Sequence, residues 1–98
     1  MELTSKQRKY LRSKAHHLKP IVLIGKLALN DSILKSIDDS LNHHELIKIK
    51  FNDHKSSKET LISKVNSRLS SQTVGMIGNI AILYRQIEEI DKRRYLLD

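Results

Sequence analysis

Segments with the apolar spacing of helices alternate along this chain with short runs typical of strands, and this alternation constrains the fold more than any other feature. The spacing predicts helices over residues 4–18, 31–42 and 57–70, and strands over residues 21–24, 44–51, 72–77 and 80–85. The resulting order, α-β-α-β-α-β-β, predicts a compact single α/β domain in which three helices pack on a four-stranded mixed sheet.

Short polar pairs mark where helices and turns are expected to begin. These pairs are Thr4 with Gln7, Asn30 with Asp31, Ser56 with Glu59, and Gly78 with Asn79. The first and third pairs fit capping boxes, in which each side chain satisfies a free backbone N–H at a helix start. Either member of the second pair is suited to cap a helix, and the last pair predicts a tight hairpin turn.

The strand segments differ in the faces that they are expected to bury. Residues 21–24 are a continuous, mostly β-branched apolar run, which predicts a strand buried on both faces. Between residues 44 and 51, isoleucines and Phe51 alternate with Lys48 and Lys50. This period of two predicts that one face of the strand meets the core and that the other face is largely exposed to water.

The composition excludes several classes of protein. The chain has no Cys, so it has no disulfide scaffold, thiolate metal centre or thiol nucleophile. Its His residues include adjacent pairs whose side chains diverge, and no nucleophile or phosphate-loop motif is present. We therefore expect no enzymatic activity, cofactor, metal or small-molecule substrate.

No apolar run is long enough to span a bilayer and the first residues are polar, so we expect a soluble cytoplasmic protein without a membrane partner.

The net charge of +7 is concentrated in the first fifth of the chain, where residues 1–20 contain six Lys or Arg and one Glu. On a helical wheel, Lys6, Lys9 and Arg12 share the face of the first helix that lies opposite Leu11. Localised positive charge on a small domain indicates a polyanionic partner, most often nucleic acid. The alternative is a solvated helix face that only keeps the protein soluble.

A second candidate site lies between the first strand and the second helix. Gly25 lets a backbone approach a ligand closely, and Lys26 adds a cation. The backbone N–H groups at the start of the helix carry partial positive charge, which attracts phosphate. In the alternative interpretation the segment is a plain turn, in which Asn30 or Asp31 occupies those N–H groups itself.

Several stretches of the chain resemble the CRM domain (chloroplast RNA splicing and ribosome maturation), and most closely its bacterial YhbY-like members. These stretches are residues 16–25 (HHLKPIVLIG), 43–50 (HHELIKIK), 77–78 (IG) and 82–85 (ILYR). The resemblance covers about residues 2–85, so we divide the chain into a domain over residues 1–85 and a charged tail over residues 86–98. The sequence does not decide whether the tail is a short helix or a mobile extension.

The resemblance implies a fold similar to the C-terminal domain of translation initiation factor three, and RNA binding with association with precursors of the large ribosomal subunit. The family's Gly-x-x-Gly loop, likened to the backbone clamp of KH domains, falls on Gly25, Lys26, Leu27 and Ala28. Ala replaces the second Gly here, and a positive φ at this position would strain it by roughly 1 kcal/mol. Asn79 also stands where family members often have a basic residue.

Together these observations predict a basic, non-catalytic RNA-binding protein that binds rRNA in precursors of the large subunit, and we expect it to be a monomer. The residues expected to contact RNA are Lys6, Lys9, Arg12, Lys19, Gly25, Lys26, Leu27 and Ala28. The first alternative is a module that binds a ribosomal or assembly protein through the sheet face with Lys48 and Lys50. The second alternative is a double-stranded DNA-binding protein.

Overall fold

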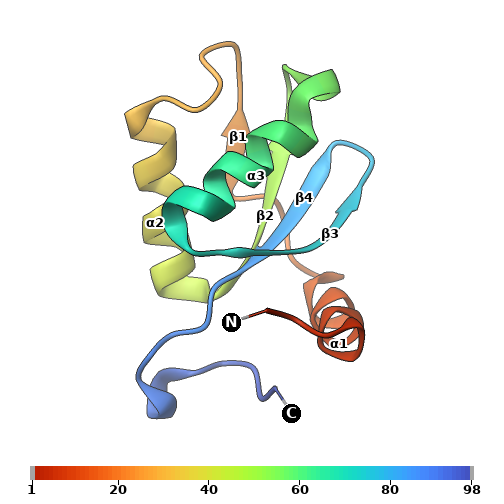
Figure 1. The fold of residues 1–98 in the computed structure, drawn as a ribbon, viewed down its shortest axis with the longest axis vertical. Coiled ribbons are helices and arrows are strands. Elements are labelled where there is room, and N and C mark those ends of the chain that lie inside the picture. Colours follow the sequence, from red (N-terminus) through yellow and green to blue (C-terminus); the bar gives the residue numbers. More distant parts are fainter. Residues whose placement is uncertain (1, 98) are drawn as a thin grey trace.

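The computed structural model describes residues 2–97 and follows the predicted order of helices and strands (Figure 1). Its regular elements are α1 (Ser5–Ala15), β1 (Val22–Ile24), α2 (Asp31–His44), β2 (Leu46–Phe51), η1 (Lys55–Ser57), α3 (Lys58–Leu69), β3 (Gln72–Ile77), β4 (Ile80–Tyr84) and η2 (Ile90–Lys92). The α/β class and the order of elements are therefore confirmed.

The four strands form one mixed sheet with the order β1-β2-β4-β3. β1 is parallel to β2, with α2 as the crossover between them, and β4 is antiparallel to both β2 and β3. The predicted hairpin turn joins β3 to β4, and Gly78 adopts a φ of 57° in it, which glycine tolerates without steric cost. β1 and β3 are thus the two edge strands of the sheet.

Helices cover both faces of this sheet and divide the interior into two cores. α2 and α3 pack on one face, where their apolar stripes meet aliphatic side chains of β1, β2 and β4. α1 packs on the other face, where Leu11 and Ala15 meet Leu46, Ile82 and Tyr84 in a second core. None of the helices within residues 2–97 is long and apolar enough to cross a membrane.

Two predictions about the sheet faces are wrong. The burial of each strand depends on which part of the sheet a helix covers, and the sequence of the strand alone does not show this. The first strand is not buried on both faces, since Leu23 is 53% exposed. The second strand is not largely wet on its outer face, since Leu46 is 1% exposed beneath α1. α1 covers the part of this face around Tyr84 and leaves the part around Leu23 and Lys50 open.

The predicted starts of the first two helices are confirmed. Gln7 donates its backbone N–H to Thr4 Oγ1 over 3.1 Å, and Thr4 donates its backbone N–H to Gln7 Oε1 over 2.9 Å, which completes the capping box. Asn30 is the cap of α2, because its Oδ1 accepts the backbone N–H of Ile33 over 2.8 Å. α1 ends at Ala15, before the predicted end at residue 18.

The capping box predicted at Ser56 and Glu59 is wrong. A 3₁₀ turn over Lys55–Ser57 leads directly into α3, so the N-cap position falls on Ser57. Ser57 makes no side-chain capping hydrogen bond. The turn itself supplies the transition into the helix, which local sequence spacing did not reveal.

The segment after β4 folds back over the second core. Tyr95 packs edge-on against Tyr84, with ring centroids 6.4 Å apart, and Leu97 joins the same cluster. Glu45, fully buried at the end of α2, accepts the backbone N–H groups of Ile87 over 2.9 Å and Arg94 over 2.5 Å. The tail is therefore a docked segment with one short 3₁₀ turn, so it is neither the short α-helix nor the mobile extension that the sequence left open.

Candidate nucleic-acid interface

The cationic residues predicted on α1 occupy different environments. Lys9 is exposed, and no described residue from 2 to 97 pairs with its ammonium group. Lys6 lies beside Tyr10 and Leu97, where the tail meets the helix. Lys19 is exposed in the connection to β1. We call Lys6, Lys9, Arg12 and Lys19 together the helix surface.

Arg12 has a structural role in addition to its charge. Its Nη1 donates a hydrogen bond to the carbonyl oxygen of Val74 over 3.3 Å. Its side chain also crosses β3 at Gly75, where a Cβ atom would lie only 3.1 Å from Arg12 Cδ. Glycine at this position therefore makes room for the arginine, and a phosphate would have to share the guanidinium with the strand.

The loop after β1 is a tight turn with a left-handed residue at the position of the second Gly of the Gly-x-x-Gly pattern. Ala28 donates its backbone N–H to the carbonyl oxygen of Gly25 over 3.0 Å, which closes a tight turn. Ala28 has a φ of 52°, so the predicted left-handed position, with its strain of roughly 1 kcal/mol, is present. Leu27 projects at the tip and is 78% exposed. We call residues 25–28 the loop surface.

Gly25 itself is not required by the backbone. Its φ lies outside the left-handed region, and a Cβ atom built on it would meet nothing within 4 Å. The open space beside Gly25 therefore leaves room for a ligand to approach the main chain. Lys26 is exposed next to it, with no side-chain partner among residues 2–97.

A residue that the sequence analysis did not single out holds this loop in place. His54, in the connection between β2 and α3, hydrogen-bonds through Nε2 to the carbonyl oxygen of Lys26 over 2.7 Å. Because a carbonyl oxygen only accepts, Nε2 must carry the hydrogen. Asn52 and Asp53 donate their backbone N–H groups to the carbonyl oxygen of Ile24 over 3.0 and 3.2 Å. In the sequence, the only sign of this contact was the polar stretch over residues 52–57, which follows the second strand.

The structure does not bring all the predicted residues together. α1 lies in the lower part of the view along the long axis of the molecule, whereas the loop after β1 lies at the opposite, upper end (Figure 1). The eight predicted residues therefore form two cationic surfaces, and only an extended ligand would reach both.

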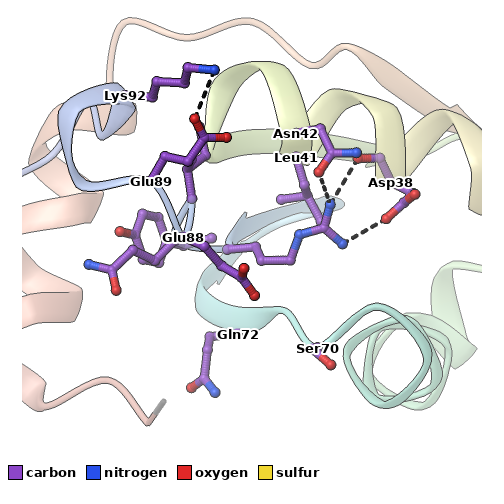
Figure 2. Close-up of a pocket in the computed structure, with 12 residues that line it drawn as sticks. Asp38, Leu41, Asn42, Ser70, Gln72, Glu88, Glu89 and Lys92 are labelled. Atoms are coloured by element: carbon purple, nitrogen blue, oxygen red, sulfur yellow. Dashed lines mark hydrogen bonds and ion pairs between the residues drawn. The ribbon is translucent and has the colours of Figure 1, made fainter.

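A separate cavity lies between the end of α2 and the tail and has a volume of about 820 Å³ (Figure 2). Its partly buried cation Arg85 is already occupied, since it donates to Asp38 Oδ1 over 2.7 Å and to Asn42 Oδ1 over 2.8 Å. Glu88 and Glu89 add negative charge to its lining. A cavity with this charge disfavours phosphate. No group of three or more His, Asp or Glu within residues 2–97 is placed to hold a metal ion.

Two tyrosines near this cavity have raised pKa values. Burial raises the pKa of Tyr84 to about 12, and the nearby carboxylate of Glu45 adds to the effect. The side chain of Gln86 acts in the opposite direction, but no group within residues 2–97 has hydrogen-bond geometry toward the buried Tyr84 hydroxyl. Burial likewise raises the pKa of Tyr95. Both tyrosines are therefore neutral and structural at physiological pH.

The fold and its surfaces define the chain as a small basic α/β domain with two separate cationic surfaces. The family model of the CRS1 / YhbY (CRM) domain matches residues 3–85. The chain belongs to this family.

Relatives of similar length support the assignment. An "RNA-binding protein" of Haemophilus influenzae is 39% identical over 88 residues, which cover 89% of both chains. A "Probable RNA-binding protein" of Bacillus subtilis is 40% identical over 88 residues, which cover 89% of this chain and 92% of that one. The solution structure of a hypothetical Staphylococcus aureus protein superposes with a TM-score of 0.78 at 37% identity, covering 93% of this chain and 96% of that chain.

Proposed function

We propose that this protein is a non-catalytic, cytoplasmic RNA-binding factor that binds rRNA in precursors of the large ribosomal subunit. The observation that carries the proposal is the concentration of exposed positive charge on α1, with a further exposed lysine, Lys26, on the loop after β1. The names of the relatives from Haemophilus influenzae and Bacillus subtilis support RNA as the polyanion. The role in large-subunit assembly is what the family resemblance implies.

In this proposal, Lys9 and Lys19 bind phosphates at the helix surface, with Lys6 and Arg12 nearby. At the loop surface, the open space at Gly25 lets the main chain approach a phosphate, and Lys26 adds charge. Aromatic residues are only 4% of the chain, so stacking on bases contributes little. Binding is therefore mainly electrostatic and strongly salt-dependent, because neutralised phosphates release counterions.

Salt-dependent binding measurements test the assignment of these lysines. We expect Lys9→Ala and Lys26→Ala each to weaken binding of a structured rRNA fragment and to lower the salt slope by about one unit. Lys35→Ala is the matched control, since Lys35 is an exposed lysine on α2 that already pairs with Asp39 over 3.5 Å. Unchanged affinity and slope in both test variants would refute the assignment.

Sedimentation of cell lysate tests the assembly role. The protein is expected to co-sediment with large-subunit precursors at low salt and to move to the free fraction at high salt. Recovery only in the free fraction at low salt would exclude a stable ribosomal partner. Competition between duplex DNA and structured RNA separates RNA binding from DNA binding.

A second candidate function is binding of a protein partner through the open part of the α1 face. By strand register, Leu23 lies opposite Lys50, Lys50 opposite Ile80, and Ile80 opposite Ile77, so these four side chains form one row across the sheet. Leu23 and Ile77 are 53% and 65% exposed. An apolar row centred on a lysine fits a partner surface that combines apolar and acidic groups.

The protein-binding alternative makes a different prediction from the RNA-binding proposal. A partner held by this row should remain bound at high salt and after ribonuclease treatment, and should be lost on Leu23→Ser. Loss of all partners after ribonuclease treatment would contradict this alternative.

A further inference from the structure

A groove lies beside the loop surface, between the start of α2 and the middle of α3. It has a volume of about 530 Å³, within the usual range of ligand-binding pockets. Its lining residues are Leu27, Ala28, Leu29, Leu34, Leu61, Lys64, Ser67 and Arg68. We call this feature the α3 groove.

The floor of the α3 groove is aliphatic and firmly held. Leu29, Leu34 and Leu61 are partly buried and pack against the first core, so their outer surfaces form a fixed apolar floor. Leu27 stands at the mouth of the groove and is mostly exposed. Such a floor favours a ligand with a flat or apolar part that covers it and removes it from water.

The charged groups of the α3 groove are all positive. Lys64 and Arg68 lie one helical turn apart on α3, and both are exposed. Neither forms a hydrogen bond or ion pair with any residue from 2 to 97. The lining contains no acidic residue, whereas the large cavity near the tail contains Asp38 and Glu88. The groove is therefore complementary to a ligand that has both an apolar part and a negative charge.

The α3 groove is continuous with the surface already proposed to bind RNA, because Leu27 and Ala28 belong to both. A chain of phosphates that reaches Lys26 would continue directly toward Lys64 and Arg68. Unpaired nucleotides supply an apolar base for the floor and a phosphate for the two cations, whereas a duplex keeps its bases stacked inside.

We propose that the α3 groove binds an unpaired segment of RNA, with bases over the leucine floor and phosphates at Lys64 and Arg68. This inference rests on the proposed function as an RNA-binding protein. The two surfaces then bind different parts of an RNA. The α3 groove selects single-stranded nucleotides, and the helix surface contacts backbone phosphates of any structured RNA.

The test uses the full chain with two probes, an unpaired RNA oligonucleotide and a blunt-ended RNA duplex of matched length. Ser67→Glu places a carboxylate among the groove cations at an exposed helix position, so the fold should tolerate it. Ser36→Glu is the matched control, because Ser36 is an exposed serine on α2 outside the groove lining. We expect Ser67→Glu to weaken binding of the unpaired RNA about tenfold or more and to change binding of the duplex by less than about twofold.

A second measurement avoids any dependence on folding of the charged variant. Because the chain has no Cys, Ser67→Cys carries a single thiol, to which a photocrosslinker can be attached. We expect crosslinks from position 67 to the unpaired RNA and few from Ser36→Cys.

The possible outcomes separate the two proposals. If the unaltered protein binds neither probe, the proposed function fails. If it binds RNA, but Ser67→Glu behaves like Ser36→Glu and position 67 yields no RNA crosslinks, the α3 groove is not an RNA site and the proposed function stands. Crosslinks from position 67 to protein alone would also overturn the inference.

Discussion

Tyr84→Phe is expected to stabilise the protein, and by more at high pH than at neutral pH. The Tyr84 side chain is 1% exposed, and its hydroxyl has no hydrogen-bond partner within residues 2–97. A buried polar group left unpaired costs about 1–3 kcal/mol. Phenylalanine keeps the ring and its contact with Tyr95 but removes this cost. We take the lower end of the range and expect the free energy of unfolding to rise by about 1 kcal/mol at pH 7.

The pH dependence follows from the raised pKa of Tyr84. An unfolded chain ionises this tyrosine near its ordinary pKa of 10.0, whereas the folded protein keeps it protonated up to about pH 12. The stability contributed by the neutral hydroxyl is therefore complete below pH 10 and is lost as the pH rises toward 12. By pH 11 the unaltered protein should lose about 1 kcal/mol from this group, and Tyr84→Phe should not.

Urea unfolding at pH 7 and at pH 11 measures both effects. Titration of lysines is common to the two proteins and cancels in their difference, which should grow from about 1 to about 2 kcal/mol. Tyr10→Phe is the control, because Tyr10 is only half-buried, and a change within about 0.5 kcal/mol is expected. Destabilisation by Tyr84→Phe would show that the hydroxyl is hydrogen-bonded, and a difference that stays constant with pH would show that folding does not raise the pKa of Tyr84; either result would refute the reasoning.

Three further substitutions test the backbone and the tail. Ala28→Gly should raise the free energy of unfolding by up to about 1 kcal/mol, because glycine relieves the left-handed strain. Gly78→Ala should lower it by about 1 kcal/mol, because it introduces the same strain in the hairpin turn. Chemical denaturation measures both changes. Glu45→Gln turns an amide donor toward the backbone N–H of Ile87 or Arg94, so we expect the free energy of unfolding to fall by about 2 kcal/mol. Hydrogen exchange should become faster in residues 86–97, and unchanged exchange there would contradict the role of Glu45.

The order of elements could be predicted because each segment carries its own apolar period. The strand boundaries agree within two residues for the same reason. The errors about the sheet concern the faces of its strands. The pattern at Leu23 is the same in an edge strand as in a central one, and the burial of Leu46 depends on a helix far away in the sequence. The exposure of Leu23 and the burial of Leu46 both depend on the sheet order β1-β2-β4-β3, and the local sequence pattern does not reveal this order.

The sequence likewise indicated the local elements of the candidate site but not the contacts between them. The loop at Gly25 stands out locally, because a glycine separates a strand from a helix. The hydrogen bond from His54 depends on knowing that β1 and β2 are parallel neighbours. The approach of Lys64 and Arg68 to Leu27 depends on how α3 crosses the sheet, which no periodicity reveals.

The contact between Arg12 and β3 has a consequence for self-association. Edge strands invite pairing with strands of other molecules, and proteins avoid this with bulges, charges and short edges. β3 has a register irregularity between Thr73 and Gly75, and the carbonyl oxygen at Val74 is already bound by Arg12. The opposite edge, β1, is only three residues long. Neither edge therefore offers a regular ladder to a second copy. We infer that α1 protects an isoleucine-rich sheet from aggregation, and that loss of Arg12 would first be seen as concentration-dependent association.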